Sequence, residues 1–289
     1  MNNCKICNGK GYIKYYNNNT YIYDLCECKY NISNQLKKRF VKDFNLPISI
    51  FRNDLFKYYI EELDEILDTK KKFIIFLDWI NSLSEIEKND IQTYLYDKLQ
   101  KAIIKFKKTE MFKFFNSLDL SNFKVLTNIK QDNIYKPEYA NNDFLSIDLK
   151  KANLQAVLIQ ELIAKQNKFI GKYRNIDKKY KEFIDKYLEP SNDKEKTYFI
   201  NSKYIRQYLF GNLNPKRQQK IQKYFISLIA NKIKNETNEE IISASNDEIV
   251  IKNPKNLNKL EQILEEIKFV NYLDLNINKF KLFQVDNFK

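Results

Sequence analysis

The sequence predicts an α+β fold, and three observations support this class. All four cysteines lie within the first 28 residues, on either side of two short tyrosine-rich runs that predict a β-hairpin. Apolar residues then recur at helical spacing over residues 31–118. Over residues 119–289, short apolar runs bounded by turn residues alternate with helical stretches, a pattern typical of an antiparallel sheet with helices. We therefore expect a small cysteine module at residues 1–30, followed by these two parts.

The cysteines predict a metal site. They form two pairs separated by 18 residues, and a hairpin with strands at 12–16 and 21–25 would bring the pairs together. Four thiolates at this spacing are typical of structural zinc, which leaves no open coordination position for catalysis. The alternatives are two disulfides, which do not suit a reducing compartment, and a redox CxxC pair, which lacks the surrounding βαβ pattern. The predicted zinc ligands are Cys4, Cys7, Cys26 and Cys28.

The middle of the chain predicts helices. Apolar residues form one amphipathic face over 55–67, while 73–83, which carries the only tryptophan, and 91–106 are apolar enough to be buried. Further helices are expected at 173–188, 198–210, 215–233 and 257–269.

One predicted core strand ends on an acid. Residues 144–147 form a short apolar run after the turn-prone residues 141–143, and Asp148 follows directly. After Asp148 the apolar residues return to helical spacing. An acid at this boundary is held rigidly and can face a cleft, but Asp is also a common helix N-cap, so both interpretations stay open. Other strands of the sheet are expected at 123–129 and 277–283.

A second acidic stretch lies near the far end of the chain. Residues 239–251 predict a hairpin with the tip Ser245-Asn246-Asp247-Glu248, because Asn-Asp supplies turn chemistry and Ile-Val-Ile restarts a strand. Carboxylates on adjacent strands could converge on Mg²⁺ or Mn²⁺, and phosphoryl transfer uses two such ions about 4 Å apart. The alternative is that Asp247 and Glu248 are ordinary turn acids.

Three segments, in chain order, resemble motifs A, B and C of the family A DNA polymerases: Ser146-Ile147-Asp148-Leu149, Arg206-Gln207-Tyr208-Leu209-Phe210-Gly211 and Ser245-Asn246-Asp247-Glu248. The resemblance covers about residues 120–289. It implies a polymerase-type palm with an antiparallel sheet and short helical fingers over about 165–235. The helical residues 31–118 occupy the place of that family's thumb.

The same resemblance implies roles for single residues. Arg206 takes the place of the family's triphosphate-binding Lys. This substitution is chemically reasonable, because a guanidinium can bind phosphate in a bidentate manner. Lys203 would assist Arg206, and Phe210 would stack under the incoming base. The alternatives are that Arg206, Lys216 and Arg217 form a solvated basic face and that Phe210 is a core aromatic. The catalytic residues implied are Asp148, Asp247 and Glu248, with magnesium or manganese on Asp148 and Asp247. The nucleic-acid-binding candidates are Lys216, Arg217 and Lys220.

Three positions depart from the family's motifs. The family's motif-A Glu and Arg fall on Asn153 and Gln155, and a later motif-B Tyr falls on Asn214. Because that Glu helps to exclude ribonucleotides in the family, the choice between DNA and RNA synthesis stays open.

Composition excludes several classes of protein. The 289-residue chain has no histidine, which excludes His general bases, Ser/His and Cys/His nucleophile pairs and His-ligated metals. The net charge of +13 favours polyanionic partners such as nucleic acid, although an AT-rich genome would also enrich lysine. Residues 150–223 carry 18 Lys and Arg against 7 Asp and Glu. Without an 18-residue apolar run or a signal-peptide core, a cytoplasmic location away from membranes is expected.

These patterns together predict a template-directed DNA polymerase that extends a primer 3′-hydroxyl from nucleoside triphosphates. RNA polymerase or primase-like activity is a variant of that prediction. The expected partners are nucleic acid, DNA rather than RNA, and replication or phage proteins. The alternative is a non-catalytic nucleic-acid-binding or assembly protein, an accessory factor of a phage or mobile element, that carries a polymerase-like palm. The zinc module and the basic charge are consistent with the polymerase and with the non-catalytic protein.

Overall fold

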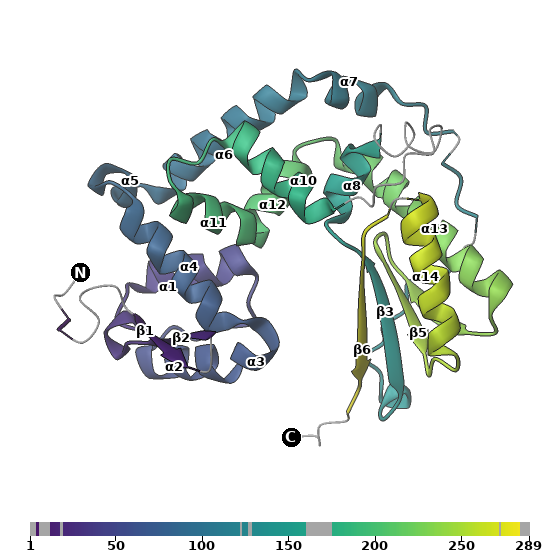
Figure 1. Cartoon of the computed structure of the whole chain (residues 1–289), viewed down its shortest axis with the longest axis horizontal. Helices are drawn as coiled ribbons and strands as arrows, with labels where there is room; N and C mark the ends of the chain where they lie inside the picture. Colours follow the sequence, from purple (N-terminus) through teal and green to yellow (C-terminus); the bar gives the residue numbers. More distant parts are fainter. Residues whose placement is uncertain are drawn as a thin grey trace. The chain divides into compact units, whose positions relative to one another are not determined.

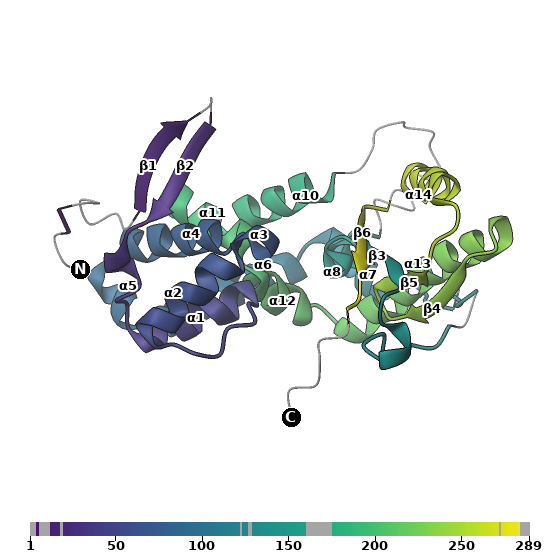
Figure 2. The ribbon, with the colours of Figure 1, turned by 90° about the horizontal axis from the view of Figure 1, so that it is seen from below.

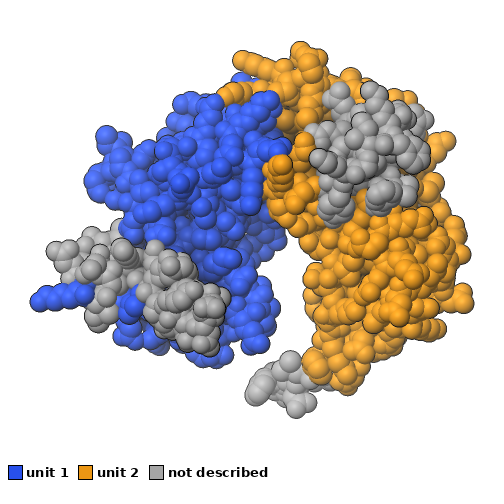
Figure 3. Space-filling view, in the orientation of Figure 1, with its two compact units in different colours: residues 1–104, 181–209 blue, residues 105–180, 210–289 orange. Residues whose placement is uncertain are grey.

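The computed structural model describes the chain except for residues 1–3, 6–11, 18–19, 122, 127–128, 160–174, 272 and 284–289. Within the described residues the fold combines helices with a four-stranded antiparallel sheet, which confirms the predicted α+β class (Figures 1 and 2). The chain divides into two compact units: residues 1–104 with 181–209, and residues 105–180 with 210–289 (Figure 3). No helix in the described part is both long and apolar enough to cross a membrane.

Unit 1 begins with the predicted hairpin. Strands β1 (Tyr12–Asn17) and β2 (Thr20–Leu25) pair antiparallel, with Tyr12 opposite Leu25. The predicted helices 73–83 and 91–106 are also present, whereas the predicted stretch 55–67 is divided between two helices that meet at Leu63. The helices of the unit, three of which extend across its limits, are η1 (Glu27–Lys29), α1 (Asn34–Phe44), α2 (Asn53–Glu62), α3 (Asp64–Leu67), α4 (Thr69–Ser82), α5 (Glu85–Asn89), α6 (Ile91–Lys107), α10 (Ile176–Phe183), the π-helix η3 (Ile184–Leu188), α11 (Asp193–Asn201) and α12 (Lys203–Gly211).

The core of unit 1 is aromatic. Phe40, Phe73, Phe76 and Trp79 have no exposed surface. The Trp79 ring stacks on Tyr198 of α11, with the ring centroids 3.7 Å apart and the planes 3° apart. Aromatic pairs of this kind contribute stability beyond the apolar area that they bury. This contact therefore helps to pack α11 against α4. Through this packing, residues 181–209, expected within the fingers, belong to unit 1.

Unit 2 is built on an antiparallel sheet in the order β4-β5-β3-β6. The central strand β3 lies between β5 and β6 and pairs with both (Figure 1). The β4–β5 hairpin forms one edge. These strands correspond to the predictions at 144–147, 239–251 and 277–283. Their bounds are β3 (Asp143–Leu149), β4 (Glu240–Ala244), β5 (Glu248–Lys252) and β6 (Leu275–Lys281).

The two faces of the sheet differ because side chains alternate along each strand. The apolar face is buried and carries Leu145, Ile147, Ile249 and Ile251. Helix α13 (Pro215–Glu236) packs against β5 and against α14 (Leu257–Asn271). The opposite face is polar toward one end, with Ser146, Asp148, Glu248 and Asn276, and carries the stacked rings of Phe144 and Phe280 toward the other end. The remaining elements of unit 2 are α7 (Glu110–Ser117), η2 (Pro137–Tyr139) and α8 (Ala152–Val157).

The predicted strand 123–129 is wrong, since no strand occupies its described residues. The following segment instead runs along the outer edge of β4, where the Ala244 N–H donates to the Lys130 carbonyl oxygen at 3.3 Å. Ser243 Oγ exchanges hydrogen bonds of 2.9 and 3.1 Å with the main chain of Asp132. On its other side, β4 pairs with β5 with a register shift between Ile241 and Ser243.

The predicted helix 198–210 is two helices, α11 and α12. Ser202 lies between them without exposed surface, and its Oγ accepts from the Ile205 N–H at 3.2 Å. Serine is a preferred N-cap because its hydroxyl satisfies an unpaired N–H of the first helical turn. The cap at Ser202 therefore starts a new helix where the apolar pattern alone predicts a continuous one.

Candidate functional site

The pairing of β3 with β5 brings the predicted acids to one end of the sheet. Asp148 lies directly opposite Glu248, and the Leu149 N–H donates to the Asp247 carbonyl oxygen at 2.8 Å. The prediction that the two acidic stretches lie on adjacent strands is therefore confirmed. All three acids are half-buried and belong to unit 2.

A serine shapes the tip of the β4–β5 hairpin. The Ser245 N–H donates to the Glu248 carbonyl oxygen at 2.9 Å, and Ser245 Oγ accepts from the N–H groups of Asp247 and Glu248 at 3.3 and 3.1 Å. The same hydroxyl donates to Asp247 Oδ1 at 3.2 Å. Hydroxyl bonds to the local backbone are a known way to stabilise a tight turn. They hold Asp247 at the apex of the hairpin.

Neighbouring strands hold the other two carboxylates. Asn276 Nδ2 on β6 donates to Asp148 Oδ2 at 3.1 Å, and Ser146 Oγ on β3 donates to Glu248 Oε1 at 2.6 Å. The N-cap alternative for Asp148 is wrong, because Lys151 occupies the N-cap position of α8. Asp148 is a sheet residue. Asn276 is not recognisable as its partner from the sequence, since the register of β6 against β3 has no local signal.

A cavity of about 600 Å³ opens over the polar face of the sheet. Ser146, Glu248 and Asn278 line it from three neighbouring strands, and residues 131–135 form a wall. Cavities of several hundred cubic ångströms are typical of sites for small ligands such as nucleotides. The Glu248 carboxylate therefore faces a space that can hold a substrate.

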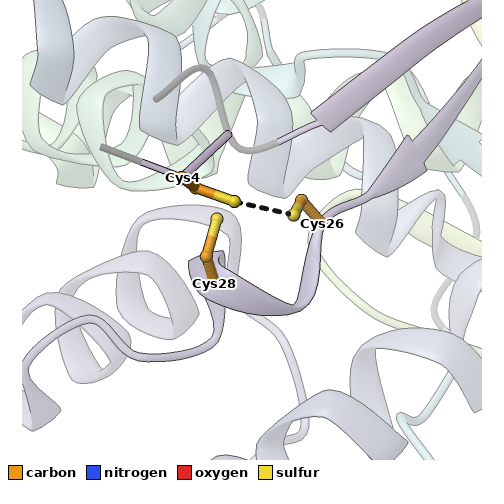
Figure 4. Close-up of side chains that lie close together, drawn as sticks. All are labelled: Cys4, Cys26 and Cys28. Atoms are coloured by element: carbon orange, nitrogen blue, oxygen red, sulfur yellow. Dashed lines mark hydrogen bonds between the residues drawn. The ribbon is translucent and has the colours of Figure 1, made fainter. Parts of the chain in front are cut away.

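The N-terminal module gathers three thiols. The Sγ atoms of Cys4, Cys26 and Cys28 lie within 4.8 Å of one another, and those of Cys4 and Cys26 are 3.7 Å apart (Figure 4). These three thiols could hold a metal ion. Cys7, the predicted fourth ligand, lies outside the described residues. Within the described part of the chain no other three Cys, Asp or Glu side chains come this close, so the acids of the sheet do not form a comparable cluster.

The predicted phosphate-binding residues lie in a different unit from the acids. Arg206 and Lys203 are on the part of α12 that belongs to unit 1. Phe210 belongs to unit 2 but has no exposed surface, and its ring centroid lies 6.3 Å from that of Tyr180. A fully buried ring has no face for an incoming base. In this structure Phe210 is the core aromatic of the alternative interpretation.

The predicted nucleic-acid-binding residues of α13 are of two kinds. Arg217 Nε donates to the Phe115 carbonyl oxygen at 3.1 Å, and its guanidinium also bonds the Leu118 carbonyl oxygen. It thereby satisfies the carbonyl groups at the end of α7, which have no partner within that helix. Lys216 and Lys220 are exposed. The structure therefore gives Arg217 a structural role and leaves the two lysines on the surface.

Two residues that depart from the polymerase motifs, Gln155 and Asn153, form hydrogen bonds that join elements of unit 2. Gln155 has no exposed surface, and its Nε2 donates to the carbonyl oxygens of Lys150 and Asp274, both at 2.7 Å. Its Oε1 accepts from the Asp274 N–H at 3.0 Å, so Gln155 connects the end of β3 to the start of β6. Asn153 Oδ1 accepts from Gln222 Nε2 at 2.6 Å and joins α8 to α13.

Replacing Gln155 by Ala is expected to lower the free energy of unfolding by about 2–4 kcal/mol. Each buried polar group left without a partner costs about 1–3 kcal/mol, and the change leaves more than one. Urea-induced unfolding measures the loss. The control is Gln219→Ala, which removes an exposed glutamine of α13 and is expected to change stability by less than about 0.5 kcal/mol. Equal small effects of both changes would show that this connection does not stabilise the unit.

No family model, curated protein or solved structure matches this chain. The basis for a functional assignment is therefore the position of its own residues. These are three carboxylates at one end of two paired strands, a cavity beside them, and three thiols in the N-terminal module.

Proposed function

We propose that the chain is a nucleotidyl transferase that extends a primer 3′-hydroxyl under the direction of a template, as family A DNA polymerases do. The observation that carries this proposal is the β3–β5 pairing, which sets Asp148 opposite Glu248 and beside the turn that holds Asp247. Strand-end and hairpin acids on neighbouring strands are what the resemblance to motifs A and C implies. The expected substrates are a primed DNA and nucleoside triphosphates.

The acids suit a divalent metal ion. Carboxylate oxygens are the ligands that Mg²⁺ prefers, and Asn276 and Ser245 orient Asp148 and Asp247 through hydrogen bonds from neutral groups. Mg²⁺ or Mn²⁺ held by Asp148 and Asp247 would supply the charge stabilisation that phosphoryl transfer requires. Ser146 fixes one oxygen of Glu248 at the cavity wall, where Glu248 supports the site.

The charge of unit 2 supports a polyanionic substrate. Its residues include 28 Lys and Arg against 18 Asp and Glu, a net of +10, whereas unit 1 has 22 against 19, a net of +3. Neutralising phosphates releases condensed counterions, which is the main source of affinity in sequence-independent nucleic-acid binding. The acids and the 600 Å³ cavity thus belong to the unit with the larger positive charge.

We also propose that the N-terminal module binds structural zinc, with Cys7 as the fourth ligand. Two thiolates about 2.3 Å from a tetrahedral zinc ion lie about 3.8 Å apart, and the observed distance between the Cys4 and Cys26 sulfurs is 3.7 Å. The module joins the core of unit 1 through Tyr30, which is buried and stacks on Phe73 with centroids 6.0 Å apart. Zinc would therefore stabilise the start of the helical unit.

The test of the polymerase proposal is extension of a labelled primer on a template, with deoxyribonucleotides or ribonucleotides, in Mg²⁺ and in Mn²⁺. Products that match the template sequence support it, and the accepted nucleotides identify the product as DNA or RNA. Tight nucleic-acid binding without extension under any of these conditions would overturn it. That result would favour a nucleic-acid-binding or assembly protein.

A further inference from the structure

Helix α13 carries a row of exposed lysines. Lys216, Lys220 and Lys223 recur at intervals of four and three residues, which places them on one side of the helix. At a rise of 1.5 Å per residue the row extends over about 10 Å. Arg217, which is a nucleic-acid-binding candidate in the sequence, does not belong to this row, because its guanidinium bonds the end of α7.

The charges of this row are not neutralised by ion pairs in the described structure. Lys232, further along α13, pairs with Glu236 and Glu266 at 2.7 and 2.9 Å, but the three lysines of the row form no such pair among the described residues. Residues 210–235 contain six Lys and Arg and no Asp or Glu. Asp119 is a nearby acid; hydrogen bonds from Ser121 lower its pKa most, and Lys220 lowers it further. The row is therefore a strongly cationic surface.

The row ends at a second cavity in unit 2. This cavity of about 500 Å³ is lined by Lys223, by Ile226 and Ala230 of α13, and by Ala244 and Asn246 of the β4–β5 hairpin. Its lining is half apolar and half polar: Ile129 is another apolar residue, and Gln131, Ser227 and Ser245 add polar side chains to Lys223 and Asn246. Val125, a further lining residue, is 51% exposed. Asn246 immediately precedes Asp247, so the cavity lies beside the candidate reaction centre.

We propose that Lys216, Lys220 and Lys223 bind successive phosphates of a single-stranded nucleic acid, and that the cavity takes one of its bases. A base can enter such a cavity only when it is unpaired, which favours a single strand over a duplex. The apolar residues of the lining can contact any base, and cationic side chains track the backbone, as in other proteins that bind single strands without sequence preference. The inference rests on the proposed function for its place beside Asp247, but binding itself requires no catalysis.

The test is the affinity of the full chain for a labelled single-stranded oligonucleotide, measured by fluorescence anisotropy between about 50 and 200 mM salt. We compare the unmodified protein with the triple variant K216A/K220A/K223A. The control variant K108A/K234A/K255A removes the same charge from three exposed lysines of unit 2 outside the row.

The row variant is expected to bind at least about tenfold more weakly at low salt. The slope of log affinity against log salt should fall by about 2, because each phosphate contact on a single strand contributes about 0.7. The control variant should keep most of the slope. Equal losses in both variants would overturn the inference, because binding would then follow total charge rather than this row.

The contribution of a base in the cavity is tested by measuring the affinity for an abasic strand of the same length. Losing the contacts of a base in the cavity is expected to weaken binding by at least about fivefold. Equal affinity for both strands would overturn the role of the cavity. Primer extension by the unmodified protein separates this inference from the proposed function: lysine-dependent binding in a protein that extends no primer supports the inference alone, and extension without lysine-dependent binding supports the proposed function alone.

Discussion

Replacing Asp148 by Asn is expected to reduce primer extension at least about a thousandfold, equivalent to about 4 kcal/mol of transition-state stabilisation. The amide keeps the shape of the side chain and can still bond Asn276, but it removes the negative charge that would hold a metal ion. A metal ion contributes several kcal/mol to phosphoryl transfer. Single-turnover extension measures the effect on the chemical step.

Asp143→Asn is the matched control for this change. Asp143 lies on the same strand as Asp148, at its other end, and its side chain is exposed. This variant should extend primers at nearly the unmodified rate. Activity that survives Asp148→Asn, or falls equally in both variants, would place the reaction centre elsewhere. Equal thermal midpoints of the two variants would exclude unfolding as the cause of a loss.

Replacing Cys26 by Ser is expected to lower the thermal midpoint of unit 1 by more than about 10 °C. Zinc binding supplies about 10–16 kcal/mol in zinc-finger peptides, and one lost ligand forfeits several of these. In a domain of this size about 3 kcal/mol corresponds to roughly 10 °C. Cys26 is buried and lies close to Tyr30, whose ring stacks in the aromatic core, so the loss should reach the helices.

Zinc content and thermal unfolding together measure this effect. The unmodified protein should carry one zinc ion per chain and release it on treatment with a thiol-modifying reagent. Glu27→Gln is the control in the same module, since Glu27 is exposed and its ion pair with Lys57 at 2.6 Å lies at the surface. It should change the midpoint little. A protein without bound zinc, in which both variants unfold alike, would contradict the metal site.

Local patterns in the sequence predict much of this fold. The β4–β5 hairpin follows from Asn246-Asp247 and from the strand residues on either side, because turn chemistry and alternation depend on near neighbours. The adjacency of Asp148 and Glu248 needed one further inference, that the strand and the hairpin share a sheet. The closeness of Cys4 to Cys26 follows from hairpin geometry in the same way.

Contacts between distant segments were not predictable by these means. Trp79 stacks on Tyr198 across 119 positions of the chain, and this packing draws residues 181–209 into unit 1. Arg217 resembles a surface cation until the end of α7 is placed beside it. Phe210 shows no local sign of its burial. In each case the deciding partner lies far away in sequence, where periodicity carries no information.

The central position of β3 has a consequence for synthesis on the ribosome. Both of its neighbours, β5 and β6, come later in the chain, and β6 ends at residue 281, 132 positions after β3 ends. At a translation rate of about 5–20 residues per second, the strand waits about 7–26 s for its last partner. Until β5 ends, 103 positions after β3 ends, Leu145 and Ile147 have no sheet to join. Nascent chains of this protein should therefore be substrates for chaperones that bind unpaired apolar strands.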